Sequence, residues 1–369
     1  MIGAGASAMM FGAYVKKSVV FVDANPHICA KVKISGGGKC NLTNENVSAK
    51  NYLGDEAFIS KSLERYSNAE TLEFFAKHGV VPSVKKDGQY FCKSSSEVLG
   101  ALYRASSHHT FLLNQKVKNV TFENGEFITE LDGERVSSKK LVVASGGVSY
   151  QSLNASDIGY KIASSFGHEI KPPTPALVGL TLQKEQFWIK ELSGVSVSAK
   201  IKYRDFLYEG DLLFSHKGIS GPVVLNASLR WEKGGIAIDF LPTFTFKNTI
   251  WQDKKQPTTL LPLPKSFTKA FLNSVGLADK PFKSYLSDER EKIISLKNYT
   301  MSPAGTFGFS RAEITKGGVK SDDITPVTFE SERRRGLYFI GEVLDVSGEL
   351  GGYNLQWAFS SGANAAKNF

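Results

Sequence analysis

The chain has 369 residues and a formal net charge of +9, with 41% apolar and 22% charged residues. This length predicts two or three domains with large cores, and this composition is typical of a globular enzyme rather than a fibrous or disordered protein. No apolar run reaches the roughly 18 residues that a membrane span requires. Lys16 and Lys17 follow the first apolar run instead of preceding it, which is the wrong order for an export signal. We therefore expect a soluble, cytoplasmic protein with no membrane partner.

The cysteines and histidines exclude two further classes of chemistry. Cys29, Cys40 and Cys92 form no Cys-x-x-Cys pair, and the six histidines show no metal-ligand spacing with them. We therefore expect neither a dithiol redox centre nor a metal. A charge of +9 fits nucleic acid, an anionic cofactor or solubility alone. Because the basic residues are dispersed, apart from the run at 333–335, a small-molecule substrate is favoured over nucleic acid.

The first 23 residues have the pattern of a Rossmann βαβ unit. Gly3, Gly5 and Ala8 stand at the positions of its phosphate-binding fingerprint, where a helix N-terminus faces a pyrophosphate. Asp23 ends an apolar strand 18 positions after Gly5, near the spacing of an acid that binds a ribose 2′-OH. Only two residues precede Gly3, so we expect a shortened first strand unless earlier residues are missing. The alternative is a glycine-rich helix start without a ligand.

Three later segments combine glycines with polar residues. Residues 35–44 (SGGGKCNLTN) predict a loop whose backbone faces an anion or a flavin edge, the alternative being a flexible surface loop. The strand at 141–144 runs into Ser-Gly-Gly, as where a chain passes beneath a cofactor. A strand at 336–340 ends in Gly341-Glu342, and the turn at 348–354 opens a helix. This last pattern supplies a carboxylate and free amides, although an ordinary strand-loop-helix ending remains the alternative.

The rest of the chain reads as scaffold. We expect helices within 55–78 and at 94–106, a hairpin at 80–90, and a meander with strands at 116–121, 126–131 and 139–144. We expect further strands at 180–183, 195–203, 206–213 and 235–241, and mainly helices at 249–300. A glycine-punctuated loop at 210–222 contains His216, for which a structural role is the alternative to a catalytic one.

Six motifs together resemble those of the YhiN/BaiN-like NAD(P)/FAD-dependent oxidoreductases, also called the aminoacetone oxidase family. They lie at 3–8, 34–44, 144–150, 210–222, 312–319 and 341–354, in the family's order, so the resemblance covers nearly the whole chain. It implies an α/β fold: a discontinuous Rossmann-like FAD-binding domain with an inserted β-barrel-like domain and a small helical subdomain. The implied boundaries are 1–175 and 306–369 for the FAD-binding domain, 176–247 for the β-rich insert, and 248–305 for the helical subdomain.

The resemblance also implies FAD as the cofactor and NAD(P)H as a transient reductant. The pyrophosphate would meet the residues at 3–7 and the adenosine ribose would meet Asp23. The residues at 39–41 would lie along the cofactor, Glu342 near the ribityl chain, and Gly352 with Asn354 near the isoalloxazine. The implied cofactor-binding residues are Gly3, Gly5, Ala6, Ser7, Asp23, Ala24, Lys31, Gly38, Lys39, Cys40, Asn41, Ala144, Ser145, Gly146, Gly341, Glu342, Gly352, Tyr353 and Asn354.

The catalytic acid or base is less defined than the cofactor contacts. His216 and Tyr353 are candidates, because each sits in a motif expected to face the flavin. Three positions depart from the family's pattern: Asp23 replaces the commoner glutamate, Lys39 the usual arginine, and Gln151 a frequent proline. We predict an FAD-dependent oxidoreductase, reduced by NAD(P)H, whose substrate the sequence does not identify. The alternatives are a flavin-dependent protein that modifies tRNA or another nucleic acid, and a flavin-binding redox module without turnover.

Overall fold

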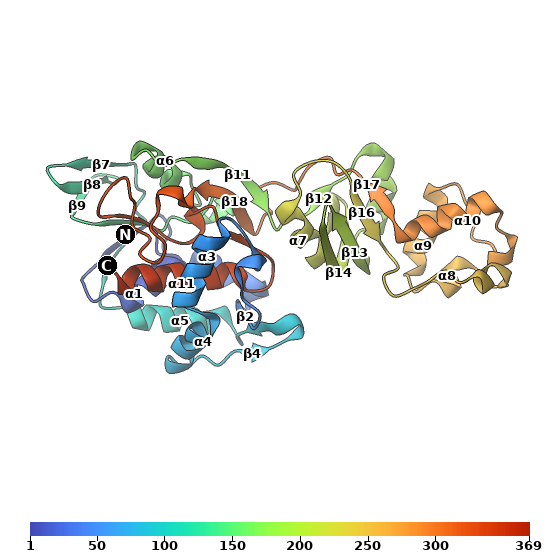
Figure 1. Cartoon of the computed structure of the whole chain (residues 1–369), viewed down its shortest axis with the longest axis horizontal. Helices are drawn as coiled ribbons and strands as arrows, with labels where there is room; N and C mark the ends of the chain where they lie inside the picture. Colours follow the sequence, from blue (N-terminus) through green and yellow to red (C-terminus); the bar gives the residue numbers. More distant parts are fainter. The chain divides into compact units, whose positions relative to one another are not determined.

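The computed structural model describes residues 1–85 and 87–369. The chain forms two compact units, and Figure 1 shows the elements of both. Unit 1 comprises Met1–Pro175 and Glu313–Phe369, and unit 2 comprises Ala176–Ala312. No helix in the described part of the chain is long and apolar enough to cross a membrane.

A parallel sheet lies at the centre of unit 1. Strand β1 (Val20–Asp23) pairs with β6 (Thr110–Leu113), and β10 (Leu141–Val143) pairs with β19 (Leu337–Phe339). Ile2 makes parallel bridges with residues of β1 and β10 and so joins the two pairs. The strands are apolar almost throughout, as expected of a parallel sheet covered on both faces. Ile2 is thus the shortened strand predicted before the glycine fingerprint.

The first and last helices of the chain pack against each other beside this sheet. Helix α1 (Ala6–Tyr14) lies along α11 (Tyr353–Lys367), as Figure 1 shows. A Cβ atom on Gly362 would collide with the carbonyl oxygen of Ser7, so the close approach of the two helices depends on this glycine. The two sequence halves of unit 1 therefore share one folded body.

The remaining elements of unit 1 surround this centre. The helices are α2 (Ala30–Ile34), α3 (Glu56–Arg65), α4 (Asn68–Lys77), α5 (Ser95–Ser106) and α6 (Ile158–Ser165). The strands are β2 (Asn41–Asn44), β3 (Tyr52–Leu53), β4 (Ser83–Val84), β5 (Gln89–Phe91), β7 (Asn119–Glu123), β8 (Glu126–Glu130), β9 (Arg135–Ser138), β11 (Ile170–Ala176), β18 (Ile314–Val319) and β20 (Ser347–Gly348).

The structure corrects one part of the predicted meander and supports the predicted hairpin. Strands β4 and β5 pair antiparallel within the expected hairpin at 80–90. The meander is β7-β8-β9, so its third strand is Arg135–Ser138 and not 139–144. The apolar run at 141–143 belongs to the central parallel sheet, where both of its faces are buried.

Unit 2 is built on an antiparallel sheet of six strands. Their order is β12 (Leu180–Thr181), β15 (Gly218–Ser220), β14 (Phe206–Ser215), β13 (Ser196–Tyr203), β16 (Ile236–Asp239) and β17 (Tyr299–Met301). Its helices are α7 (Pro222–Arg230), α8 (Pro257–Leu260), α9 (Lys265–Ser274) and α10 (Ser287–Ile294). The ring of Phe267 on α9 stacks on Phe214 and contacts Phe240, so the helices and the sheet share one core.

Two predictions for unit 2 were wrong in detail. Residues 210–222 are not a single loop, because β14 continues to Ser215 and turns directly into β15. Residues 249–300 are not helical to their end, because Tyr299 begins strand β17 beside β16. In both places a strand pairs with a neighbouring segment whose own sequence shows no regular alternation of apolar and polar residues.

A buried histidine gives unit 1 a predicted pH dependence. His168 is 4% exposed and its Nε2 lies 2.7 Å from the Oγ of Ser331. Burial lowers its pKa below the ordinary value of 6.5; nearby Asp323 opposes this shift and Arg333 supports it. The folded state therefore keeps the ring neutral, whereas the unfolded chain binds a proton below about pH 6.5. Stability should fall as the pH drops from 6.5 towards the lowered pKa of the folded state.

Urea unfolding at several pH values between 7.5 and 5 checks this expectation. His168→Gln should be less stable at pH 7.5 and should lose less stability than the unaltered protein on acidification. An equal loss in both proteins would assign the pH dependence to other groups.

Candidate cofactor site

The glycine fingerprint forms a turn at the edge of the central sheet. Gly3 has φ +96°, and a Cβ there would collide with the carbonyl oxygen of Ala144. Gly5 precedes helix α1, which has no side-chain cap. The N–H groups of Gly5, Ala6 and Ser7 have no acceptor among the described residues. A Cβ on Gly5 would meet nothing within 4 Å, so this helix start is open to an anionic ligand.

Asp23 is held beside this turn by three hydrogen bonds. Its Oδ2 accepts the N–H of Ala4 at 2.7 Å, and its Oδ1 accepts the N–H and the side-chain amide of Asn25 at 2.7 and 3.0 Å. A carboxylate offers about four acceptor positions, so one remains for a hydroxyl group. Ala4 and Asn25 were missed as orienting residues, although an Asn two positions after an Asp is a recognisable turn signal.

Glu342 connects three segments that lie far apart in the sequence. The Nζ of Lys31 donates to its two carboxylate oxygens at 3.0 and 2.8 Å, and the N–H of Thr315 donates to Oε1 at 2.9 Å. The hydroxyl of Thr315 in turn accepts the N–H groups of Val148 and Ser149 at 2.9 and 3.0 Å. The structure therefore brings together Lys31 and Glu342, which are both predicted cofactor-binding residues. It adds Thr315, which lies in the motif at 312–319 but is not among the predicted site residues.

The turn after β10 lies between the glycine fingerprint and this network. Ala144 borders Gly3, as its carbonyl contact shows. A Cβ on Gly147 would lie 3.2 Å from Oε1 of Glu342, and a Cβ on Gly146 would lie 4.0 Å from Oε2. Residues 144–147 thus form a strip of small side chains that runs from the fingerprint to the Glu342 carboxylate. An elongated dinucleotide fits such a strip, with its phosphates at the open helix start.

The motif at 35–44 meets the glycine turn before α11. Gly352 begins this helix, and a Cβ on it would lie 2.5 Å from the carbonyl oxygen of Thr43. The side-chain amide of Asn44 donates to the carbonyl of Gly351 at 3.1 Å. The amide of Asn354 bonds the N–H and the carbonyl of Gly348, so it shapes the turn. Two predicted segments that are about 300 residues apart therefore form one surface of unit 1.

Asn41 carries an orphaned polar atom within this surface. Its side-chain nitrogen donates to the Oε1 of Gln89 at 2.7 Å. Its Oδ1 is buried and has no hydrogen-bond partner among the described residues. A buried acceptor without a donor is costly, and a donor group on a ligand would remove that cost. This observation supports a ligand next to the predicted motif.

The remaining predicted residues differ in their exposure. Lys39 is exposed, Gly38 lies in the turn beside it, and Ala24 follows Asp23 and accepts a hydrogen bond from Asn154. Tyr353 is 9% exposed, and burial raises the pKa of its phenol, so the hydroxyl stays protonated at neutral pH. His216 belongs to unit 2, where it is exposed at the turn between β14 and β15.

The three cysteines are buried and unpaired, which predicts chemical inertness. Cys40 is fully buried, and burial raises the pKa of its thiol to about 11; the pKa of Cys92 rises to about 12 for the same reason, and that of Cys29 is also raised. Thiolate is the reactive form, so iodoacetamide at pH 8 should label none of them in the folded protein and all three in urea. Rapid labelling of Cys40 in the folded state would contradict this assignment.

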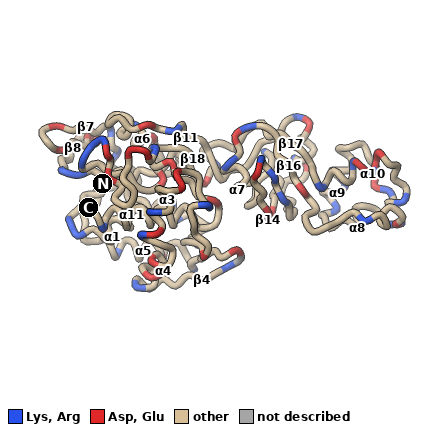
Figure 2. Tube along the Cα trace, viewed as in Figure 1, with Lys and Arg blue, Asp and Glu red and all other residues tan. Residues whose placement is uncertain are grey.

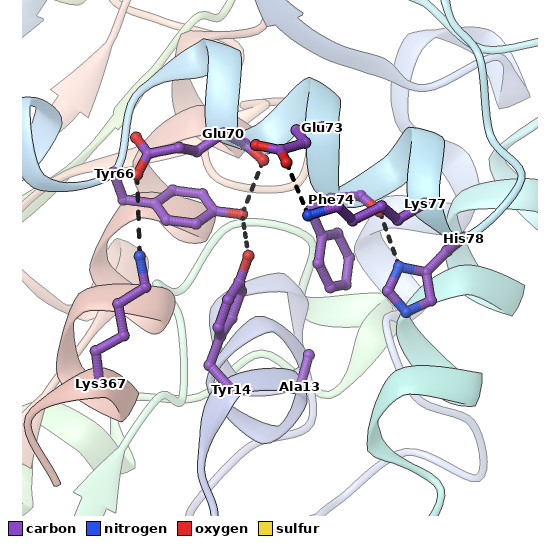
Figure 3. Close-up of a pocket in the computed structure, with 9 residues that line it drawn as sticks. All are labelled: Ala13, Tyr14, Tyr66, Glu70, Glu73, Phe74, Lys77, His78 and Lys367. Carbon is purple, nitrogen blue, oxygen red and sulfur yellow. Dashed lines mark hydrogen bonds and ion pairs between the residues drawn. The ribbon is translucent and has the colours of Figure 1, made fainter.

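A pocket of about 340 Å³ also lies in unit 1, but none of the predicted residues lines it. Figure 3 shows its walls, in which the hydroxyl groups of Tyr14 and Tyr66 lie 3.2 Å apart and Lys77 pairs with Glu73 at 2.7 Å. These side chains bond to one another instead of facing a common point. The strip at 144–147 is therefore distinct from this pocket. No group of three or more metal-ligating side chains occurs among the described residues.

The central sheet, the open helix start and the strip from Gly3 to Glu342 have the geometry of a Rossmann fold of the dinucleotide-binding class. Residues 1–368 match the model of the HI0933-like protein Rossmann domain, and the chain belongs to this family, the YhiN/BaiN-like FAD-dependent oxidoreductases. The predicted family, α/β fold and FAD dependence are thereby confirmed.

Relatives of known name match almost the whole chain. A ribosomal RNA dihydrouridine synthase of Escherichia coli K12 is 34% identical, over 98% of this chain and 95% of its own length. The protein of the same name from Haemophilus influenzae is 35% identical with the same coverage. A 3-dehydro-bile acid delta(4,6)-reductase of Clostridium scindens is 32% identical, over 100% of this chain and 97% of its own length.

A solved structure with a related fold is 3-ketosteroid-delta4-(5alpha)-dehydrogenase from Rhodococcus jostii RHA1. It is 14% identical, with a TM-score of 0.54, and the match covers 100% of this chain and 95% of that one. This likeness describes the fold.

Proposed function

We propose that this protein reduces a carbon–carbon double bond conjugated to a carbonyl group, and that its substrate is a uridine in ribosomal RNA. The observation that carries the proposal is the pair of near-full-length relatives named ribosomal RNA dihydrouridine synthase, at 34% and 35% identity. The net charge of +9 suits a polyanionic substrate. Of the two predicted substrate classes we therefore prefer nucleic acid to a small molecule.

The same chemistry unites these relatives with the bile acid reductase, which is 32% identical. Conversion of uridine to dihydrouridine saturates a double bond next to a ring carbonyl, and reduction of a 3-oxo steroid diene does the same. For uridine and for the Δ4 bond of the steroid, a hydride reaches the carbon β to the carbonyl and a proton reaches the α carbon; for the Δ6 bond of the steroid, the hydride reaches the δ carbon of the conjugated system. The active site must therefore supply a hydride and a proton donor.

The residues of unit 1 divide these tasks. FAD, when bound, supplies the hydride, which NAD(P)H provides to it. The N–H groups of Gly5 and Ala6 would hold the pyrophosphate, Asp23 a ribose hydroxyl, and Glu342 a hydroxyl of the ribityl chain. Tyr353 is the preferred proton donor, because it follows Gly352 at the turn that contacts Thr43, whereas His216 stands exposed in a turn of unit 2.

A reduction assay with two kinds of substrate tests the proposal. The protein, reconstituted with FAD, is incubated with NADH or NADPH and with unmodified transcripts of bacterial ribosomal RNA. Dihydrouridine is measured by mass spectrometry of the digested nucleosides, and a 3-oxo-Δ4 steroid is offered in parallel. We expect dihydrouridine in equal amount to the NAD(P)H oxidised, and no reduced steroid. Steroid reduction without dihydrouridine would replace the RNA substrate with a small enone.

A further inference from the structure

The net charge of the protein is divided unequally between its two units. Unit 2 has 19 Lys and Arg against 12 Asp and Glu, and unit 1 has 26 against 24. Unit 2 therefore carries +7 of the total +9, although it contains only 137 of the 369 residues. Such asymmetry between parts of one chain is typical of proteins that bind nucleic acid with the basic part.

Within unit 2 the largest share of the excess charge, +4 of the +7, lies in one stretch, residues 240–278. It contains five lysines and a single acid, Asp253. The carboxylate of Asp253 accepts the N–H of Lys255 at 2.7 Å and so serves the local turn. All five lysines are exposed, and none has an ion-pair partner among the described residues: Lys247, Lys254, Lys255, Lys265 and Lys269. We call these five residues the lysine face.

Helix α9 shows why this charge is directed to solvent. Phe267, Phe271 and Leu272 are buried in the core of unit 2. Lys265 and Lys269 are four positions apart, so they are neighbours on one exposed side of the helix, and the helix contains no acidic residue. The apolar side thus fixes the helix on the sheet, and the opposite side presents two adjacent ammonium groups.

Two aromatic rings lie among these lysines. Phe246 and Trp251 are half-buried, and their rings stack with centroids 5.9 Å apart and an interplanar angle of 10°. Lys247 lies between them in sequence, and Lys254 follows shortly after. Interleaved lysines and partly exposed aromatic rings are the usual composition of a surface that binds single-stranded nucleic acid.

The neighbouring helix α10 provides a contrast within the same unit. It carries Asp288, Glu289 and Glu291, and Glu289 pairs with Lys280 at 2.8 Å. Figure 2 shows acidic residues at α10, whereas α9 bears only basic ones. Helix α10 therefore has three acidic residues against two basic ones, whereas α9 has two basic residues and no acidic one.

We propose that the lysine face of unit 2 binds the phosphodiester backbone of the RNA substrate. Five unpaired ammonium groups release counterions from the RNA on binding, and this gain does not depend on base sequence. The inference deepens the proposed function, on which it rests, by naming the surface that holds the RNA while a uridine is reduced at the flavin. Base selection is left to other residues, because phosphate contacts position the nucleic acid without reading its sequence.

Binding of a fluorescein-labelled transcript of bacterial ribosomal RNA to the full-length, FAD-loaded protein tests this surface. The test variant is Lys265→Gln with Lys269→Gln. The control is Lys16→Gln with Lys61→Gln, which removes the same charge from two exposed lysines of unit 1. At 0.15 M salt the test variant should bind the RNA about tenfold more weakly. The slope of its plot of log K against log salt concentration should become about 1.5 less negative. The control should change affinity by less than about twofold.

Equally weakened RNA binding in the test variant and the control, or unchanged RNA binding in the test variant, would overturn the proposal that the lysine face binds RNA. Unchanged thermal unfolding of the test variant shows that any loss of binding is not a loss of fold. The assay for dihydrouridine separates the two proposals. If the unaltered protein forms no dihydrouridine, and the test variant but not the control binds RNA more weakly, the proposed RNA-binding surface stands and the proposed function fails. If dihydrouridine forms and the test variant binds normally, the proposed function stands and the surface fails.

Discussion

Replacing Gly3 by alanine is expected to abolish retention of FAD and to lower the free energy of unfolding by about 3 kcal/mol. Gly3 has φ +96°, a conformation that alanine adopts only under strain. Its new Cβ would also collide with the carbonyl oxygen of Ala144 and lie 2.9 Å from the carbonyl carbon. Both atoms are backbone of the central sheet and cannot move aside. Urea unfolding and the visible flavin spectrum after reconstitution measure the two effects.

Gly5→Ala is the matched control, because it adds the same methyl group two residues away. Gly5 has φ −80°, and the added Cβ would meet no protein atom within 4 Å. Stability should therefore stay unchanged, while FAD binding weakens because the methyl group occupies the space through which a pyrophosphate approaches the backbone. Normal flavin binding by Gly5→Ala would contradict the prediction that the pyrophosphate binds at this turn. Normal binding by Gly3→Ala would contradict the strained geometry itself.

Replacing Thr315 by valine is expected to cost about 2–4 kcal/mol of unfolding free energy, because it removes the shared acceptor of two N–H donors, one buried and one partly buried. The hydroxyl accepts from Val148 and Ser149 and lies 3.0 Å from the Oγ of Ser149. Thr315 is 1% exposed, so water cannot take over these bonds. Valine keeps the shape, and the cost therefore measures the lost bonds rather than a cavity. A lower midpoint in thermal unfolding would report it.

Thr315→Ser distinguishes the contribution of the hydroxyl group to stability from that of the methyl group. Serine keeps the acceptor and loses one methyl group, so it should retain most of the stability that valine loses. The loop at 146–149 borders Glu342, and its loosening in Thr315→Val should also weaken FAD binding. If serine and valine proved equally destabilising, the loss would lie in packing and the hydrogen-bond argument would fail.

Secondary structure was predictable where the local pattern and the tertiary partner agree. The hairpin at 80–90, the helix that begins after Gly5 and the strand ending at Asp23 all follow from local residue types. The third strand of the meander was misplaced because the apolar run at 141–143 is the stronger strand signal. Its apolar residues instead suit a parallel sheet buried on both faces, and Arg135–Ser138, which alternates weakly, completes the meander.

The site was predictable in its motifs and not in its contacts. Lys31 and Glu342 are 311 residues apart, and no local pattern indicates that they form an ion pair. The part played by Thr315 depends on a loop 166 residues away. The role of each residue towards FAD stays a prediction, as do the domain limits at 247 and 305.

The sequence by itself determined the family, the α/β fold and the use of FAD, because these depend on short glycine-containing motifs whose backbone requirements are local. Only the tertiary structure decided which charges are paired and which are free, because pairing depends on the distance between side chains and not on their order. It showed that Glu342 pairs with Lys31 within unit 1, and that the five lysines of the lysine face have no ion-pair partner among the described residues. The proposed RNA-binding surface rests on these exposed lysines.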